Sequence, residues 1–324
     1  MAPKSHLVKL FVKVIDSIKL PPLRQRGRPL VYPPLVILKC TLVMVYYRLT
    51  SLRSLERFLH QHLGVAQACG LTHRIPCYRT FARRFQTLES PATQAAWKLL
   101  RRLIRRRWIR LMILATDASL LAAKGRSPKG RSPDKRTSDR EAVWGYSSVD
   151  KSWLWGYKLH LISTVRPCMA PLLWHVTRAN LNEGRHLSVL LKQKTLWSRK
   201  RPWCLADRAY DSRRNVTFLQ KHRLRLVTPI KGNRWPPSHM KGDRQKRLKL
   251  FKRWCRDNRF KRLRADIERL LGQLKEVFLL DPLPLKGLKN VQTYIALVLL
   301  AYLAGIAYNG SMHRGLRAIK SLVA

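Results

Sequence analysis

Paired cysteines, acidic residues and long apolar runs are all scarce in this chain of 324 residues. The six cysteines include no C-x-x-C pair, so neither a zinc site nor a disulfide framework is indicated. They are therefore predicted to be small buried residues of a protein from a reducing compartment. The most apolar run, residues 294–308, is about 15 residues long, which is short for a membrane span and favours a buried helix.

The balance of charge is the strongest feature of the composition. Asp and Glu number only 17 against 66 Lys and Arg, which gives a formal net charge of +49. Self-repulsion at that charge lowers stability, and a polyanionic partner would relieve it and release counterions. Because the basic residues run along the whole chain, we expect a broad contact surface for nucleic acid. An anionic membrane, or simply a basic and well-solvated exterior, is the alternative.

Residues 1 to about 110 are predicted to be helical. Residues 35–47 form an apolar run, Ser51 is placed to cap the helix that follows, and a longer helix starts at Ser90 and ends in a cluster of arginines. Small helices with arginine on one face suit DNA grooves and phosphates. A helical bundle with a charged exterior explains any single one of these helices equally well.

From residue 111 onwards the pattern changes to short apolar strands that alternate with helices. This order predicts an α/β domain built on a mixed sheet. Residues 124–140 are predicted to be a loop, and the very basic residues 231–257 a loop or insertion. The expected strands cover residues 111–117, 153–165, 171–179, 202–207 and 224–230, and the expected helices lie near residues 186–193, 213–222 and 258–280.

Asp117 and Asp207 share a setting, because each closes a short apolar strand and is followed by a break in the pattern. If the two strands are neighbours in one sheet, the two carboxylates lie close together and repel, and a divalent cation would relieve that repulsion. Hard oxygen ligands favour Mg²⁺ or Mn²⁺, and two such ions would activate a nucleophile and stabilise the leaving oxygen in phosphoryl transfer. Taken singly, each aspartate is more simply explained as a turn or cap residue.

The predicted helix over residues 258–280 supplies a third acid, Glu268. With about 100° of rotation per residue, four charged residues fall within about 40° of one line down this helix: Lys261, Arg264, Glu268 and Lys275. An apolar stripe lies about a third of a turn away, so the helix can pack on the sheet while the charged line faces a cleft. A lone acid among cations suits a metal ligand flanked by phosphate binders, and salt-bridge decoration is the alternative. Asp266 and Glu276 lie off the line and better fit that decorative role.

Three motifs carry a resemblance to a known family. The first is Ala115-Thr-Asp117, and the second is Leu205-Ala-Asp-Arg-Ala-Tyr-Asp-Ser212. The third is the spacing Y-(2)-R-(3)-E-(6)-K, matched by Arg264, Glu268 and Lys275. Over roughly residues 30–310 the chain resembles a bacterial insertion-sequence transposase of the DDE type, a family with an RNase H-like catalytic domain.

Two further segments extend the resemblance, and one residue departs from it. Gly156-Tyr-Lys-Leu-His160 is similar to a G-x-K-x-H strand between the first two acids, and residues 75–84 resemble the N-terminal helical region of the family. Lys261 stands where the family has the tyrosine of its third motif, which affects a contact at that position rather than the metal site.

The resemblance implies a DNA transposase that hydrolyses a phosphodiester at the element ends and joins the freed 3′-OH to target DNA. Asp117, Asp207 and Glu268 would be the catalytic residues and would hold two Mg²⁺ ions, for which Mn²⁺ could substitute. For His160 a packed core histidine is an equal expectation, and Tyr210 with Asp211 would shape the pocket or contact a flipped base. The implied DNA-binding residues are Arg264, Lys275, Lys261, Lys158, His160, Tyr210, Arg83 and Arg84.

The implied organisation has three parts. A helical DNA-binding region would span residues 1–110, and a basic tail residues 311–324. Between them, residues 111–310 would form the catalytic domain, an α/β fold with an RNase H-like mixed sheet flanked by helices and a basic insertion at about 231–257. The expected partners are double-stranded DNA, as terminal repeats and as target, and a second copy in a homodimer on DNA, with no membrane. The resemblance places the protein in the prokaryotic cytoplasm, at the nucleoid.

Three other hypotheses remain open at the level of sequence. An RNase H-like nuclease, such as a junction resolvase, would cut DNA without joining it. A transposase-derived DNA-binding protein would have lost the chemistry, although all three acids stand in a chain with few acids. A structural RNA-binding protein would explain the charge but not the placement of the acids.

Overall fold

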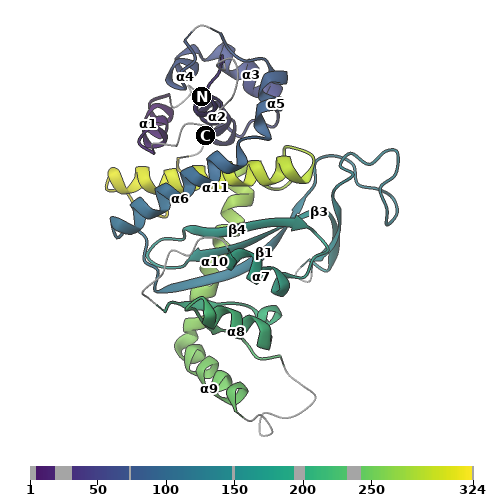
Figure 1. The fold of residues 1–324 in the computed structure, drawn as a ribbon, viewed down its shortest axis with the longest axis vertical. Helices are drawn as coiled ribbons and strands as arrows, with labels where there is room; N and C mark the ends of the chain where they lie inside the picture. The colour runs from purple at the N-terminus through teal and green to yellow at the C-terminus, as the bar shows by residue number, and fades with distance from the viewer. Residues whose placement is uncertain are drawn as a thin grey trace.

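A computed structural model describes residues 5–18, 31–72, 74–147, 150–192, 201–231 and 242–322. Figure 1 shows a layered, elongated molecule, with a group of helices at one end, a sheet in the middle and two further helices at the other end. Both labelled termini lie beside the first group of helices. The acids singled out in the sequence analysis are positioned by the sheet and by the long helix over residues 259–278.

Helices are the only regular elements among the described residues up to 105, as predicted. Ser51 caps the third of these helices, because its hydroxyl accepts a hydrogen bond of 3.1 Å from the Ser54 amide. The predicted long helix begins at Glu89, one residue before the expected start. The helices are α1 (Ser5–Asp16), α2 (Pro34–Tyr46), α3 (Leu52–Gln61), α4 (Leu63–Ala68), α5 (Tyr78–Phe85) and α6 (Glu89–Arg105).

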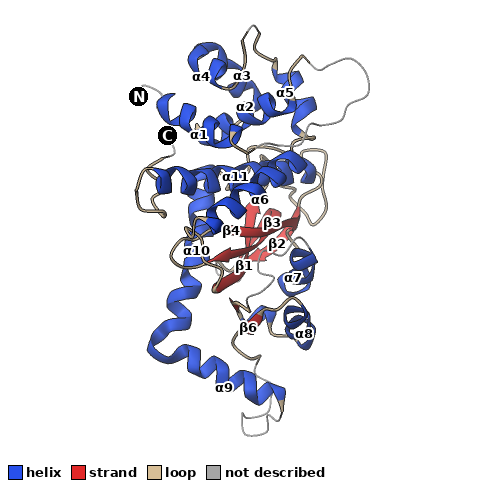
Figure 2. Cartoon of the chain, turned by 60° about the vertical axis from the view of Figure 1, so that its left-hand side comes forward, coloured by secondary structure: helices blue, strands red, loops and turns tan. Residues whose placement is uncertain are grey.

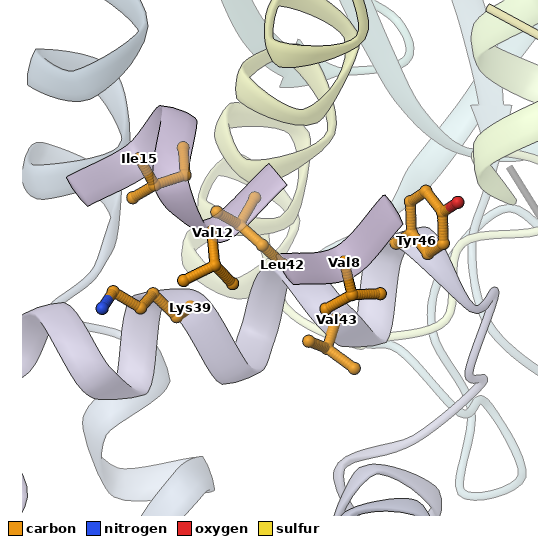
Figure 3. A pocket seen from close by; sticks show the side chains of 7 residues that line it. All are labelled: Val8, Val12, Ile15, Lys39, Leu42, Val43 and Tyr46. Atoms are coloured by element: carbon orange, nitrogen blue, oxygen red, sulfur yellow. The ribbon is translucent and has the colours of Figure 1, made fainter. Parts of the chain in front are cut away.

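The helices α1 and α2 pack through their apolar side chains. Figure 3 shows valines and an isoleucine of α1 beside the side chains of Leu42 and Val43 on α2. Lys39 lies at one end of this contact, and its ammonium pairs with the Asp16 carboxylate at 2.5 Å. Because Lys39 is nearly buried, that partner compensates for the loss of hydration.

The sheet is mixed, which confirms the predicted fold class. The strand order is β2-β3-β1-β5-β6, and β4 also pairs with β3. β1 is antiparallel to β3 and parallel to β5, and β5 is parallel to β6. The strands are β1 (Ile113–Ala122), β2 (Val143–Ser147), β3 (Ser152–Thr164), β4 (Pro171–Arg178), β5 (Trp203–Leu205) and β6 (Arg225–Val227).

Helices cover both faces of the sheet. Figure 2 shows α10 on one side of the strands and α7 on the other. The apolar stripe predicted for α10 is buried, so the helix packs on the sheet as expected. These helices are α7 (Glu183–Lys192), α8 (Arg213–Lys221), α9 (Asp243–Cys255), α10 (Arg259–Phe278) and α11 (Leu288–Ser311), with short 3-10 helices η1 (Arg208–Tyr210) and η3 (Arg256–Asn258).

The helix α11 contains the most apolar run of the chain and forms the centre of the core. Among the described residues it alone is long and apolar enough to cross a membrane, and 94% of that apolar window is buried inside the protein. In Figure 1 it lies between the N-terminal helices and the sheet. The prediction of a buried core helix is therefore confirmed.

One predicted loop and one strand differ from the sequence analysis. The basic stretch expected as a loop or insertion contains the helix α9 over part of its length, while residues 232–241 lie outside the described residues. Arg247 of α9 ties this helix to the segment after β5, since its guanidinium pairs with the Asp211 carboxylate at 2.7 Å. The strand β2, which the sequence analysis did not predict, pairs with the first half of β3.

Asp266 was interpreted as surface decoration, and that interpretation is wrong. Its side chain is fully buried and forms ion pairs with Arg269 at 2.7 Å and with Arg317 at 3.2 Å. Arg317 also donates to the backbone carbonyls of Val165 and Pro167. The segment after α11 is thereby fastened to α10 and to the turn between β3 and β4.

Candidate active site

Asp117 and Asp207 occupy equivalent positions on neighbouring parallel strands. Ala115 of β1 pairs with Leu205 of β5, and each aspartate follows two residues later. Asp117 does not end its strand as predicted, because β1 continues to Ala122 while β5 stops. Asp207 does follow its strand, and it caps η1 by accepting a 2.7 Å hydrogen bond from the Ala209 amide. The two carboxylates therefore meet where β5 ends beside the longer β1.

Glu268 is connected to Asp117 through Arg264. The Arg264 guanidinium lies 3.6 Å from Asp117 Oδ2 and also forms a close ion pair with Glu268 Oε1. The spacing of four residues puts Arg264 and Glu268 one turn apart on α10, as the sequence predicted. The predicted acids thus come from a strand, a turn and a helix that are distant in sequence.

Burial raises the pKa of Asp117 to about 7. The Ala118 amide and the Arg264 guanidinium act in the opposite direction, and the negative charges of Glu183 and Asp207 raise the pKa further. Within the described ranges, no three His, Cys, Asp or Glu side chains converge closely enough to hold a metal ion in this arrangement. Arg264 is instead the positive charge that contacts both Asp117 and Glu268.

Glu183 is an acid of this region that the sequence analysis missed. It is the first residue of α7, and its carboxylate pairs with the Lys158 ammonium at 3.4 Å. Burial raises the pKa of Glu183, and the negative charge of Asp207 adds to the effect while Lys158 opposes it. The available signal was the scarcity of acids, since a Glu that opens a helix directly after an apolar strand is one of only 17.

Lys158 and His160 lie opposite Leu120 and Ala118 of β1 in the register of the sheet. Because side chains alternate along a strand, both project to the face that does not carry Asp117. His160 is buried and its Nε2 lies 2.9 Å from the Thr177 hydroxyl, so it is a packed core residue rather than a surface that DNA can reach. Lys158 contacts Glu183 and the Leu181 carbonyl.

Tyr210 and Asp211 follow the second acid and face inward. Tyr210 is 1% exposed, which leaves no surface for a flipped base and supports the expectation that it shapes the pocket. Burial raises the pKa of Tyr210, and the charges of Asp117 and Glu183 contribute. Asp211 accepts a 2.7 Å hydrogen bond from the Lys231 amide in addition to its pair with Arg247.

The remaining predicted DNA-binding residues lie at two places. Lys261 is exposed on α10, and Lys275, on the same line of the helix, pairs with Asp281 at 3.3 Å. Arg83 and Arg84 are on α5, in the N-terminal group of helices, with Arg83 exposed and Arg84 half-buried. Figure 1 places α5 at the end of the molecule, away from β1. Of the α10 cations, the structure thus brings Arg264 into contact with the acids, and it leaves the α5 arginines on a separate surface.

Two family models match the chain. A model described as a transposase DDE domain covers residues 108–304, and a model described as a transposase domain covers residues 1–87. The first match contains Asp117, Asp207 and Glu268, and the second contains Arg83 and Arg84. No match was found among curated proteins.

Solved structures with a similar course of the chain include two kinds of transposase. A piggyBac transposase synaptic complex with hairpin DNA is 10% identical, with a TM-score of 0.46, over 98% of this chain and 78% of that one. A pre-cleavage Mos1 transpososome is 9% identical, with a TM-score of 0.23, over 87% of this chain and 80% of that one. A Mos1 paired-end complex with the left transposon end is 10% identical, with a TM-score of 0.22, over 78% of this chain and 79% of that one.

Proposed function

Because this chain belongs to the transposases with a DDE domain, we propose that it cuts and joins DNA by a metal-dependent reaction at Asp117, Asp207 and Glu268. The observation that supports this site most directly is the position of the two aspartates. They stand side by side on parallel strands, and Arg264 connects the first of them to Glu268. A strand, a turn and a helix thus supply the three proposed acids, in a protein that has few acids.

The chemistry of these side chains fits divalent cations. Carboxylate oxygens are hard ligands of the kind that Mg²⁺ and Mn²⁺ prefer, and since burial raises the pKa of Asp117, a bound cation would favour its ionised form. Asp117, Asp207 and Glu268 would hold two Mg²⁺ ions, for which Mn²⁺ could substitute. Bound ions would supply activation of the attacking oxygen and stabilisation of the leaving oxygen.

The proposed reaction has two steps. In the first, a water oxygen bonds to the phosphorus at the element end, the bond from phosphorus to the 3′ oxygen breaks, and a 3′-OH is freed beside a 5′-phosphate. In the second, that 3′-OH bonds to a target phosphorus and a target 3′-OH leaves. Arg264, Lys261 and Lys275 lie on one line of α10 beside the acids, where they would bind the phosphates of the bound strand.

The proposed partners are double-stranded DNA, as terminal repeats and target, and a second copy of the chain. The net charge of +49 supports DNA binding over a broad surface. Arg83 and Arg84 belong to the helical region 1–110, which we propose as the DNA-binding region next to a catalytic domain over 111–310. Action at the nucleoid in the prokaryotic cytoplasm follows from this proposal.

The decisive experiment measures Mg²⁺-dependent cleavage and strand transfer on DNA that carries the flanking ends of the encoding locus. E268Q should lose both activities by about a thousand-fold or more, because it removes several kcal/mol of transition-state stabilisation. E276Q is the matched control, since Glu276 lies on the same helix in an exposed pair with Lys320. Full activity in E268Q would refute the assignment of this residue.

The same assay separates the proposal from its rivals. Cleavage without joining of a labelled 3′-OH end to a plasmid would favour an RNase H-like nuclease. Tight binding without cleavage in Mg²⁺ or Mn²⁺ would favour a DNA-binding protein that has lost the chemistry. Preference for RNA over duplex DNA in competition would favour an RNA-binding protein.

A further inference from the structure

The first turn of α7 is packed directly against the turn that carries Asp207. Gly184 makes this approach possible, since a Cβ atom at that position would lie only 2.9 Å from the Ala209 carbonyl oxygen. Ala209 is in turn held by Asp207, whose carboxylate accepts the Ala209 amide. Glu183, the residue before Gly184, is therefore placed beside the second of the proposed metal-binding acids.

Glu183 is held in a mostly buried ion pair. Its side chain is 27% exposed, and that of Lys158 is 11% exposed. Lys158 also donates to the Leu181 carbonyl, so its ammonium is fixed over the start of α7. A carboxylate in such a place needs a positive charge nearby, and Lys158 supplies it on the α7 side as Arg264 does on the α10 side.

A second feature of the region is the hydroxyl of Tyr210. It is buried and makes no hydrogen bond of good geometry among the described residues, although the Thr116 hydroxyl lies near enough to lower its pKa. Tyr210 ends η1, which Asp207 caps, and burial raises its pKa with further contributions from the charges of Asp117, Glu183 and Asp207. A buried hydroxyl without a partner is costly, and a water or ligand held between the acids would satisfy it.

We infer that Glu183 is a fourth metal-binding carboxylate, which reaches the ion held by Asp117 and Asp207 from the side of α7. The inference rests on the proposed function. Glu268 and Glu183 would then flank the two aspartates from opposite faces of the sheet, one on α10 and one on α7. Glu183 would exchange its ion pair with Lys158 for the metal ion when the ion is bound.

The test is titration of the full-length protein with Mn²⁺, followed by electron paramagnetic resonance of the free ion. E183Q should weaken Mn²⁺ binding by about 10- to 100-fold. E183D keeps the charge but withdraws the carboxylate by one methylene, so it should also weaken binding if Glu183 contacts the ion. E276Q, an exposed acid elsewhere, should bind as the wild type does.

Each outcome is informative. Wild-type affinity in E183D together with weakened binding in E183Q would show a through-space effect of charge, and would overturn the inference. Unchanged Mn²⁺ affinity in both, with only a lower melting temperature of the metal-free protein, would assign Glu183 to stabilising α7 and overturn it as well. If D207N loses Mn²⁺ binding while both Glu183 variants keep it, the proposed function survives and the fourth ligand does not. Wild-type protein that binds no Mn²⁺, alone or with DNA, would contradict the proposed function itself.

Discussion

His160 is a neutral base enclosed between the sheet and α7. Its ring stacks on His186 at 4.7 Å and lies 6.4 Å from His175, and burial together with the charges of His186, Lys158 and His175 lowers its pKa to about 3. The pKa of both neighbouring histidines is lowered by burial too. Three rings that resist protonation thus lie where α7, through His186, packs on His160 of β3 and His175 of β4.

The low pKa of His160 makes stability depend on pH. In the unfolded chain histidine takes up a proton below about pH 6.5, whereas in the folded protein His160 stays neutral down to about pH 3. The unfolded state therefore binds more protons within this window, and stability is lost as pH falls through it. Between pH 6.5 and 5 we expect His160 to account for a loss of about 2 kcal/mol.

The measurement compares urea unfolding of the wild type and H160Q at several pH values. The difference between the two proteins isolates this residue, because Asp117 and Glu183, with raised pKa values, change stability in the opposite direction as pH falls. H160Q should be less stable at pH 7 but should show a flatter decline towards pH 5. Parallel pH profiles for the two proteins would contradict this explanation.

At the scale of the element, α10 presents two kinds of acid on different faces. Glu268 lies beside Arg264 and is half exposed, whereas Asp266 is fully buried among Arg269 and Arg317. Because Arg317 belongs to the segment after α11, Asp266 joins α10 to that C-terminal segment. Asp266 therefore helps to hold α10, and with it the proposed metal ligand Glu268, in place without itself reaching the site.

D266N should destabilise the protein by about 1.5 to 3 kcal/mol, because it removes the buried negative charge that accepts hydrogen bonds from the partly exposed Arg269 and Arg317. The comparison is E276Q on the same helix, where the exposed pair with Lys320 is screened by solvent and the unfolding midpoint should hardly move. Chemical denaturation of both variants at pH 7 provides the measurement. Equal midpoints for D266N and the wild type would show that Asp266 does not fasten the C-terminal segment.

The elements that could be predicted from sequence are those with a regular pattern. The stripe of α10 follows the helical period, so this helix was found with bounds close to the observed ones, while the continuous apolar run at 294–308 revealed only the central part of α11. The strand β2 is only five residues long and carries no alternation beyond its aromatic residues, and it was missed. The helix α9 is so rich in Lys and Arg that its pattern is hidden, since polar residues occupy nearly every face.

The site was predictable only where a motif fixes the spacing. Glu268 and Arg264 are four residues apart, and a helix alone brings them together. Glu183 belongs to no such motif, and its position depends on the packing of α7 against η1, which only the folded chain shows. Asp266 was misjudged because the helical period tells which residues share a face but not which later segment, here that of Arg317, covers it.

At the scale of the whole molecule, the positive charge is spread over parts with different tasks. Figure 1 shows the N-terminal helices at one end and α9 at the other, with the catalytic sheet between them. The last turns of α5 and α6 are basic, and α9 carries six Lys and Arg residues in DRQKRLKLFKRWC. A long DNA segment could therefore be held at both ends of the molecule while the acids act in the middle.

This distribution predicts opposite effects of salt on the free protein and on its DNA complex. In the free protein, added salt screens the repulsion that accompanies a net charge of +49, so the melting temperature should rise with NaCl concentration. In the complex, every neutralised phosphate releases a counterion, and added salt opposes that release. The dissociation constant for duplex DNA should increase on the order of 10³- to 10⁵-fold between 50 and 200 mM NaCl.

Both salt effects are measured on one preparation of the protein. Thermal unfolding without DNA gives the melting temperature, and fluorescence anisotropy with a labelled duplex gives the dissociation constant. If both the dissociation constant and the melting temperature rise with salt, the positive charge destabilises the free protein and serves to bind a polyanion. A dissociation constant that hardly changes with salt would contradict the proposal of a broad phosphate contact surface, and would place the affinity in a few base contacts instead. The acids of the site repel phosphate, so bound cations must offset their charge before DNA can bind there. Mg²⁺ should therefore lower the dissociation constant for duplex DNA when the ionic strength is kept constant.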